Sequence, residues 1–169
     1  MHTGDIAEID GDGFVKIVDR KKELIINEAG KNMSPTNIET AMKSASPLIA
    51  QVVAIGDAKP YVSALVVLDP EVVEAQRDAL GLGGDSAASV AENATVRAVI
   101  TEAIKQGNAK LSRVEQIKRF RILPTVWEPG GEEMTPTMKL KRKPIAEKYR
   151  PEIDSLYAAS AGPDVIDLG

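Results

Sequence analysis

The sequence has 169 residues, 43% of them hydrophobic and 27% charged, with a formal net charge of −4, which indicates one globular domain and argues against a general nucleic-acid binder. It has no cysteine and a single histidine, His2, so disulfides, thiolate metal sites and Cys nucleophiles are excluded, and Ser–His–Asp catalysis or a histidine-rich metal site has almost nothing to use. The remaining polar groups are Lys, Arg, Asp, Glu and backbone amides, a set suited to phosphates and carboxylates.

The sequence pattern also bears on the cellular location. No apolar run approaches membrane-spanning length, and the N-terminus lacks the charged and apolar regions of a signal peptide. We therefore expect a cytoplasmic protein. Peripheral contact between basic side chains and anionic lipid is left open, because such contact needs no membrane span.

The first predicted elements form a β-hairpin. Residues 6–9 (IAEI) and 14–18 (FVKIV) alternate in polarity as strands do, and the DGDG between them is a strong turn signal. A two-stranded hairpin alone is marginally stable in water. We therefore expect the chain to be a fragment of a larger protein, with the hairpin left from the larger part.

The middle of the sequence predicts a helix followed by two strands and two more helices. Ser34 can cap a helix that has Pro35 in its first turn. Residues 48–56 and 61–69 read as two strands joined by a turn, residues 70–81 as a short helix, and the apolar stripe at 96–104 as one face of a longer helix.

The last third predicts one more strand and one more helix. Residues 116–124 (QIKRFRILP) alternate charged and apolar side chains, as in a strand with one exposed face. A loop follows, and a helix is expected to start within 139–149. The predicted fold class is therefore α+β, with a small β-sheet flanked by helices and preceded by the N-terminal hairpin.

Positive charge is concentrated in TPTMKLKRKPI, residues 135–145, although the chain is acidic overall. Three explanations compete: a solvated helix face, a nucleic-acid or membrane patch, and a site for a phosphate-bearing substrate. The low aromatic content of 4% disfavours base stacking on nucleic acid.

Three stretches in order resemble one family. HTGDIAEIDGDGFVKIVDRKKELII, EAGKNMSPTNIE and TPTMKLKRK are similar to the C-terminal part of adenylate-forming enzymes, and most similar to long-chain fatty-acid–CoA ligases. The resemblance covers residues 2 to about 157. It implies the following division: residues 1–19 as the last hairpin of a large N-terminal domain, 20–22 as a hinge, 23–157 as a C-terminal lid, and 158–169 as a disordered tail.

The resemblance also implies a function. Enzymes of this family use ATP and Mg²⁺ to convert a fatty acid to an acyl-adenylate and pyrophosphate, and coenzyme A then displaces AMP to give acyl-CoA. The family's phosphate loop, adenine segment and acyl pocket have no counterpart in this sequence. We therefore expect a lid that is inactive without an N-terminal adenylation domain as its partner and that binds neither ATP, Mg²⁺ nor CoA tightly by itself.

The resemblance assigns roles to several polar residues. Asp5 matches the aspartate that accepts hydrogen bonds from the ATP ribose, and Arg20 matches an arginine that contacts ribose or phosphate. Lys22 aligns with the hinge residue, with Asp19 as the alternative. Gly30 lies in the loop that reaches the CoA site in the thioester-forming pose. No metal ligand is expected in this chain. Without the resemblance, a turn Asp, a surface Arg and a turn glycine would explain these residues.

Lys139 matches the lysine that enters the active site during adenylation and bridges the carboxylate and the α-phosphate. In many relatives the residue before this lysine is glycine, and here it is Met138. Lys141, Arg142 and Lys143 could meet the phosphates of CoA or be a solvated helix start. The alternative function is a stand-alone module that binds anionic lipid or nucleic acid through this basic stretch.

Overall fold

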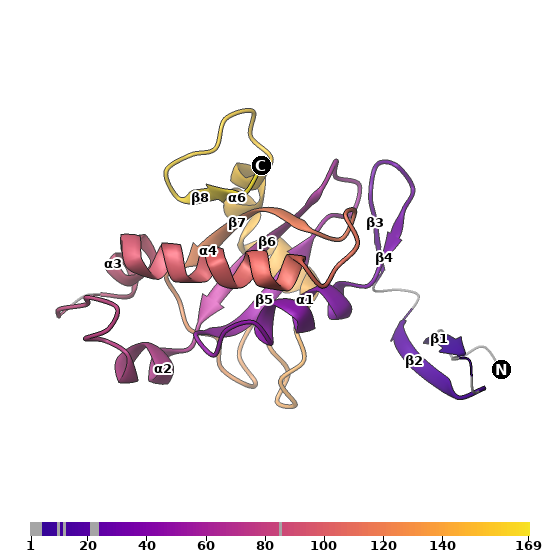
Figure 1. The fold of residues 1–169 in the computed structure, drawn as a ribbon, viewed down its shortest axis with the longest axis horizontal. Coiled ribbons are helices and arrows are strands. Elements are labelled where there is room, and N and C mark those ends of the chain that lie inside the picture. Colours follow the sequence, from indigo (N-terminus) through magenta and orange to yellow (C-terminus); the bar gives the residue numbers. More distant parts are fainter. Residues whose placement is uncertain (1–4, 10, 12, 21–23, 85) are drawn as a thin grey trace.

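The computed structural model describes residues 5–9, 11, 13–20, 24–84 and 86–169. Its centre is a four-stranded sheet with helices on both faces (Figure 1), which confirms the predicted α+β class. None of the described helices is long and apolar enough to cross a membrane.

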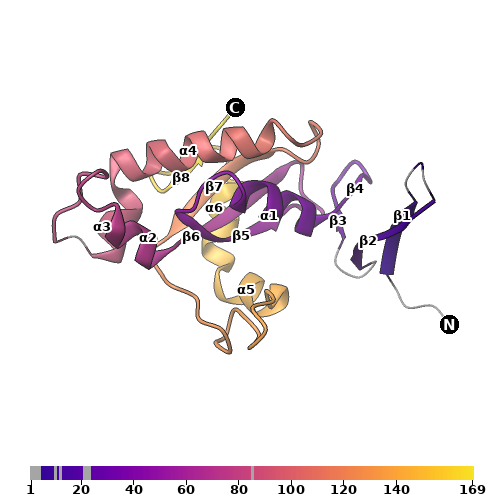
Figure 2. The same ribbon diagram turned by 60° about the horizontal axis from the view of Figure 1, so that its bottom comes forward.

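Two short hairpins precede the sheet. The first pairs β1 (Asp5–Ile9) with β2 (Val15–Arg20), as predicted, and lies at the N-terminal end of the molecule beyond the second hairpin (Figures 1 and 2). The second pairs β3 (Ile25–Ile26) with β4 (Asn32–Met33).

The four-stranded sheet has the order β5-β6-β7-β8. Strands β5 (Ile49–Ile55) and β6 (Val62–Leu68) are antiparallel, as their short connection requires. Strand β7 (Ile117–Leu123) runs parallel to β6, because the chain crosses back through helices before re-entering the sheet. Every residue of β6 is buried, as expected for a central strand that is covered on both faces.

Two of the helices begin directly after a residue whose side chain caps the first turn. Helix α1 (Pro35–Lys43) starts where the Ser34 side chain accepts a hydrogen bond from the Asn37 amide at 3.2 Å. Helix α4 (Ala94–Asn108) starts at Asn93, whose side chain accepts from two amides of the first turn. The shorter α2 (Pro70–Ala75) and α3 (Ala87–Glu92) lie in the connection between β6 and α4.

The apolar faces of α1 and α4 cover one face of the sheet. Their fully buried side chains include Ile38, Ile100 and Ile104, and these pack on alternate residues of the strands, with Phe120 of β7 as the largest. Gly107 brings the two helices together, since a Cβ at that position would lie 2.6 Å from the sulfur of Met42.

The opposite face is covered by α5 (Arg142–Lys148), α6 (Arg150–Leu156) and the loop before them (Figure 2). The sequence predicted one last helix that starts within 139–149, and the chain forms two short helices there, because Pro151 interrupts a continuous helix at their junction. The Tyr157 hydroxyl accepts from Ser63 at 2.7 Å and donates to the carbonyl of Ile55 at 2.9 Å, and burial raises its pKa to about 12.

The prediction of a disordered tail at 158–169 is wrong for its last part. Residues Val165–Asp167 form β8, which pairs with β7 at the edge of the sheet. Val165 is buried in the core of the second face, and ion pairs join Arg119 to Asp167 at 2.7 Å and Arg121 to Asp164 at 3.0 Å. The segment is ordered because Val165 is buried and the strand pairs with the edge of the sheet.

Candidate active-site surface

The predicted catalytic lysine stands on a small hairpin, residues 134–140, which we call the Lys139 hairpin. Met134 and Leu140 form an isolated antiparallel bridge at its base. Next to this bridge the Thr135 amide donates to the carbonyl of Lys139 at 2.8 Å, and the Lys139 amide donates to Oγ1 of Thr135 at 3.0 Å. The threonine therefore holds the backbone of the lysine from both sides.

Met138 has a left-handed backbone, with φ of 62°, and its side chain is 60% exposed. Its amide donates to the carbonyl of Thr135 at 2.9 Å, which closes the turn. Glycine adopts this conformation without strain, whereas a Cβ makes it costly. The turn therefore has the geometry of a glycine-bearing turn although it contains methionine.

The four cations of residues 139–143 have different surroundings. Lys139 is exposed, and its ammonium has no partner among the described residues. Lys143 is also exposed, with a loose contact of 4.0 Å to Glu147. Lys141 instead donates to the carbonyl of Gly131 at 2.8 Å. The basic stretch is therefore not one uniform solvated face.

Arg142 makes the strongest ion pair of the group. Its two terminal nitrogens donate to the two carboxylate oxygens of Glu39 at 2.7 and 2.9 Å. Glu39 lies on α1, its side chain is only 10% exposed, and its Oε1 also accepts from the amide of Ala54 at 3.0 Å. The pair joins α5, α1 and β5, and a bidentate geometry of this kind is both directional and strong.

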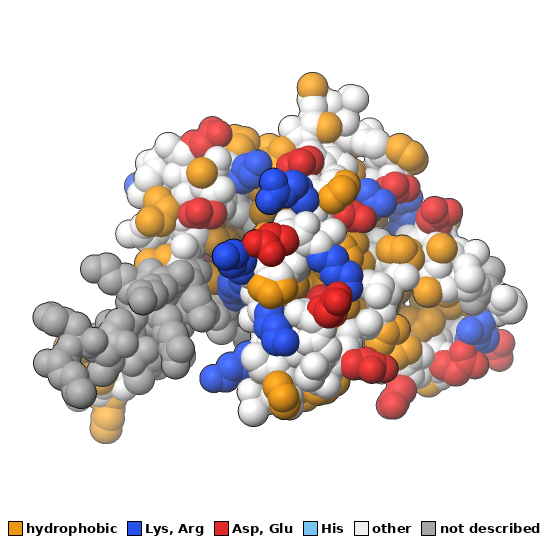
Figure 3. All heavy atoms as spheres, turned by 180° about the vertical axis from the view of Figure 1, so that it is seen from behind, with side chains coloured by type: hydrophobic (Ala, Val, Ile, Leu, Met, Phe, Trp, Pro, Cys, Tyr) orange, Lys and Arg blue, Asp and Glu red, His pale blue; other side chains and the backbone are white. Residues whose placement is uncertain are grey.

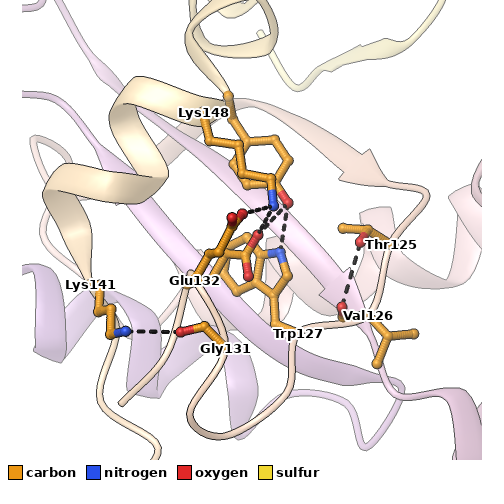
Figure 4. A network of polar contacts seen from close by, with 9 residues as sticks. Thr125, Val126, Trp127, Gly131, Glu132, Lys141 and Lys148 are labelled. Atoms are coloured by element: carbon orange, nitrogen blue, oxygen red, sulfur yellow. Dashed lines mark hydrogen bonds and ion pairs between the residues drawn. The ribbon is translucent and has the colours of Figure 1, made fainter.

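A second polar network joins the end of α5 to the loop before the Lys139 hairpin (Figure 4). Glu133 accepts from the ammonium of Lys148 at 2.7 Å and from the hydroxyl of Tyr149 at 3.0 Å, and Tyr149 in turn accepts from the indole N–H of Trp127 at 3.0 Å. Lys148 also donates to Glu132 at 2.6 Å. Trp127 is therefore a buried anchor and not a stacking platform.

These contacts set the protonation of the network. Burial raises the pKa of the Glu133 carboxyl, but the hydrogen bonds from Lys148 and Tyr149 outweigh burial and hold the pKa below its ordinary value of 4.5. The hydrogen bonds to Glu132 and then Glu133 raise the pKa of Lys148 above its ordinary value of 10.5. Burial likewise raises the pKa of Tyr149. The network therefore remains a carboxylate with an ammonium at neutral pH.

A groove of about 540 Å³ opens beside the Lys139 hairpin. Leu140 and Arg142 line it from the hairpin side, and Leu24 and Ile25 line it from the segment that follows residues 21–23. The rest of the lining is mostly apolar. On the face of the molecule seen in Figure 3, basic side chains are interspersed with acidic and apolar ones. The groove is thus bordered by Leu24 and Ile25, which follow the predicted hinge, and by Leu140, which follows the predicted catalytic lysine.

The residues predicted to bind nucleotide lie on the first hairpin. Asp5 and Arg20 are directly opposite each other in the register of β1 and β2, and Asp19 is opposite Ile6. The strand register therefore places positions 5 and 20 side by side in the backbone. Lys22 lies outside the described residues.

Gly30 is at the exposed turn between β3 and β4, with φ of 74°. Its amide donates to the carbonyl of Asn27 at 2.9 Å, and no atom lies within 4 Å of the place where a Cβ would stand. A turn requirement therefore explains this glycine fully, and its proximity to CoA stays a prediction. Among the described residues, no group of three or more Asp, Glu or His side chains is arranged to hold a metal ion.

The sequence interpretation missed the partner of Arg142 and the network around Glu133. Glu39 and Arg142 are 103 residues apart in the chain, and no local pattern marks the pairing. The Glu133 network had a weak signal, because aromatic and charged residues cluster around the loop at 127–133.

Comparison with known families gives one match that covers most of the chain. The family described as AMP-binding enzyme C-terminal domain matches residues 22–161. The chain is 54% identical over 167 residues to a protein of Mycobacterium tuberculosis named as a fatty-acid–CoA ligase, fadD11, across 99% of this chain and 29% of that protein. It is 43% identical over 157 residues to the long-chain-fatty-acid–CoA ligase FadD15 of the same organism, across 92% and 26%.

Solved structures agree on the fold. The adenylation domain of a carboxylate reductase from Mycobacterium chelonae superposes with a TM-score of 0.71 at 23% identity, over 92% of this chain and 22% of that one. A fatty acyl-CoA synthetase of Mycobacterium tuberculosis gives a TM-score of 0.52 at 23% identity, over 89% and 24%. The chain thus spans less than a third of the length of the relatives that it matches.

Proposed function

Because the chain belongs to the family of AMP-binding enzyme C-terminal domains, we propose that it is the mobile lid of a long-chain fatty-acid–CoA ligase. Relatives that carry this name match nearly the whole chain. The partner in this proposal is a large N-terminal adenylation domain, which supplies most of the pocket for ATP and the fatty acid. The proposed location is the cytoplasm, with membrane contact confined to the surface.

The proposed reaction has two steps. A carboxylate oxygen of the fatty acid attacks the α-phosphorus of ATP, which carries Mg²⁺, and pyrophosphate leaves. The thiol of CoA, after losing its proton, then attacks the acyl carbonyl, and AMP leaves with the electron pair of the broken C–O bond. The lid rotates between the steps, so that different edges of it face the substrates in turn.

Lys139 is the proposed catalytic residue of the first step. Its ammonium would lie between the attacking carboxylate and the α-phosphate and stabilise the negative charge that they share in the transition state. The observation that carries the proposal is the position of Lys139: it is exposed directly after the turn of the Lys139 hairpin, with no partner for its charge among the described residues. An ammonium without an ion-pair partner breaks no such contact when it meets a substrate.

The remaining sites are proposed from the family resemblance and from their positions. Asp5 would accept from the ribose hydroxyls and Arg20 would contact ribose or phosphate, and their cross-strand pairing supports action on one nucleotide. Lys22, or Asp19, would be the hinge. Gly30 would line the CoA channel in the second pose.

The variant Lys139→Ala tests the proposed catalytic role of the lysine. The test uses fadD11 with its matching C-terminal part replaced by this chain, so that an adenylation domain is present. Removal of one preorganised charge contact should slow acyl-adenylate formation by about 100- to 1,000-fold. The conversion of preformed acyl-adenylate to acyl-CoA should be unchanged, because Lys139 has left the site by then. Pyrophosphate release and thioester formation measure the two steps.

Lys143→Ala is the matched control, since it removes another exposed lysine four positions away. It should leave adenylate formation unchanged. If Lys139→Ala slows both steps equally, or neither, Lys139 does not have the proposed role.

A further inference from the structure

The Lys139 hairpin is braced from both ends by charged contacts. Before it, Glu133 is held by Lys148 and Tyr149. After it, Arg142 is held by Glu39. The backbone of the two ends is also joined, since the amide of Lys141 donates to the carbonyl of Glu133 at 2.8 Å. The contacts that hold the hairpin in place are therefore made by residues on either side of Lys139.

The Arg142 brace reaches deepest into the fold. Glu39 is 7% exposed, and the same carboxylate oxygen that receives Arg142 also receives the amide of Ala54 in β5. The ion pair therefore attaches the base of the hairpin to α1 and, through the Ala54 amide, to β5 of the buried sheet. Two parallel hydrogen bonds restrict the side-chain torsions of both residues, so that the distance between α5 and α1 varies little.

This engagement changes what the arginine can do. Both of its terminal nitrogens are directed at Glu39, whose negative charge offsets the attraction for a phosphate. Binding a CoA phosphate through Arg142 would require leaving a nearly buried carboxylate without its partner, which is strongly unfavourable. Of the three cations after Lys139, this one is therefore the least suited to be a phosphate ligand.

We propose that the Glu39–Arg142 ion pair is a positioning device for Lys139: it fixes the base of the Lys139 hairpin against α1 and β5, so that the ammonium arrives at the carboxylate and the α-phosphate in reactive geometry. The inference rests on the proposed role of Lys139. Arg142 touches no substrate in this account, and it acts in the adenylation step alone. A misplacement of about 1 Å at a reacting centre can cost about 100-fold in rate.

The experiment uses the same full-length chimeric ligase and three changes. Arg142→Met removes the cation and keeps an unbranched, largely apolar side chain. Glu39→Gln removes the anion and keeps an oxygen for the Ala54 amide. The double variant removes both charges and leaves no buried carboxylate without a partner. Thermal unfolding midpoints and the rates of the two half-reactions are measured for each.

Arg142→Met should slow adenylate formation by about 10- to 100-fold and lower the unfolding midpoint. The double variant should recover most of the midpoint, because exchanging a whole buried pair for neutral groups is far less costly than breaking it. Adenylate formation should stay slow in the double variant, and thioester formation from preformed acyl-adenylate should be unchanged in all three. A purely structural pair would instead give an adenylation rate that recovers together with the midpoint.

A cycle with Lys139→Ala tests whether the pair acts through the lysine. Adding Arg142→Met to Lys139→Ala should cause no further loss of adenylation rate, because there is no longer an ammonium to position. A further loss as large as that in the native background overturns the inference. The surface pair is the matched control: Lys143→Met with Glu147→Gln should change neither the unfolding midpoint nor the rate of adenylate formation.

The outcomes separate the two proposals. A normal adenylation rate in Lys139→Ala overturns the proposed function of the lysine, and the positioning role with it. A slow Lys139→Ala together with a normal rate in Arg142→Met, or with parallel loss of both half-reactions in Arg142→Met, overturns the positioning role alone.

Discussion

Met138 occupies a turn position whose backbone conformation glycine would adopt with less strain. Its φ of 62° and its 60% exposed side chain mean that the Cβ brings strain while most of the side chain adds no buried contact. We predict that Met138→Gly stabilises the chain by about 0.5–1 kcal/mol, the relief of left-handed strain less the added freedom of glycine in the unfolded chain. Urea unfolding measures it.

Met138→Val is the opposite control at the same position. A β-branched residue is the least tolerant of a left-handed backbone, so the valine variant should be less stable than the native chain. The order glycine, methionine, valine is expected, and a glycine variant less stable than the native chain would contradict the account of the turn.

Helix α5 is held to the loop before it by charge, as Figure 4 shows for Lys148 and its partners. Glu133 is 7% exposed and accepts from Lys148 and Tyr149, so we predict that Glu133→Gln costs about 1–3 kcal/mol at neutral pH. Because the pKa of Glu133 is lowered by folding, its contribution is present above the ordinary value of 4.5 and is lost as pH falls through the lower folded value.

The pH dependence provides the check on this element. Between neutral pH and about pH 3, the unfolding free energy of the native chain should fall more than that of Glu133→Gln, and the two should converge in acid. Parallel curves for the two proteins across this range would show that the Glu133 carboxylate is not the stabilising group.

At the scale of the whole molecule, the sheet is completed by its last strand. Strand β8 lies outside the residues matched by the family, which end at 161, yet it buries Val165 and brings Asp164 and Asp167 to two arginines of β7. We predict that ending the chain after Ala161 costs about 2–4 kcal/mol, from one buried valine and the lost strand pairing. Urea unfolding midpoints measure it.

Asp167→Asn is the milder companion of that truncation. The amide of Gly169 and the side chain of Arg119 hold the pKa of Asp167 below its ordinary value, but the group is partly exposed, so a small loss is expected. A truncated chain with the native midpoint would mean that β8 adds nothing to the stability of the sheet.

Sequence reasoning recovered the parts of the fold that depend on local patterns. The apolar runs of β5 and β6, the alternation in β7 and the stripe of α4 each express burial on one or both faces. Lys139 could be singled out as a candidate because its motif is contiguous. In contrast, the partner of Arg142 is 103 residues away, and the pairing of β8 depends on which edge of the sheet is free. Both are properties of the assembled fold and leave no local trace.

The parallel pairing of β6 with β7 has a kinetic consequence. Residues 69–116 separate the two strands, so the ends of a long loop must meet before β6 gains its second neighbour. The conformational entropy of closing this loop is lost before the strand pairing can compensate for it. During synthesis on the ribosome, β5, β6 and the helices after them therefore emerge with one side of the central strand still unpaired. Refolding is paced by this late, non-local event, and the half-made sheet before it is the species most prone to aggregate.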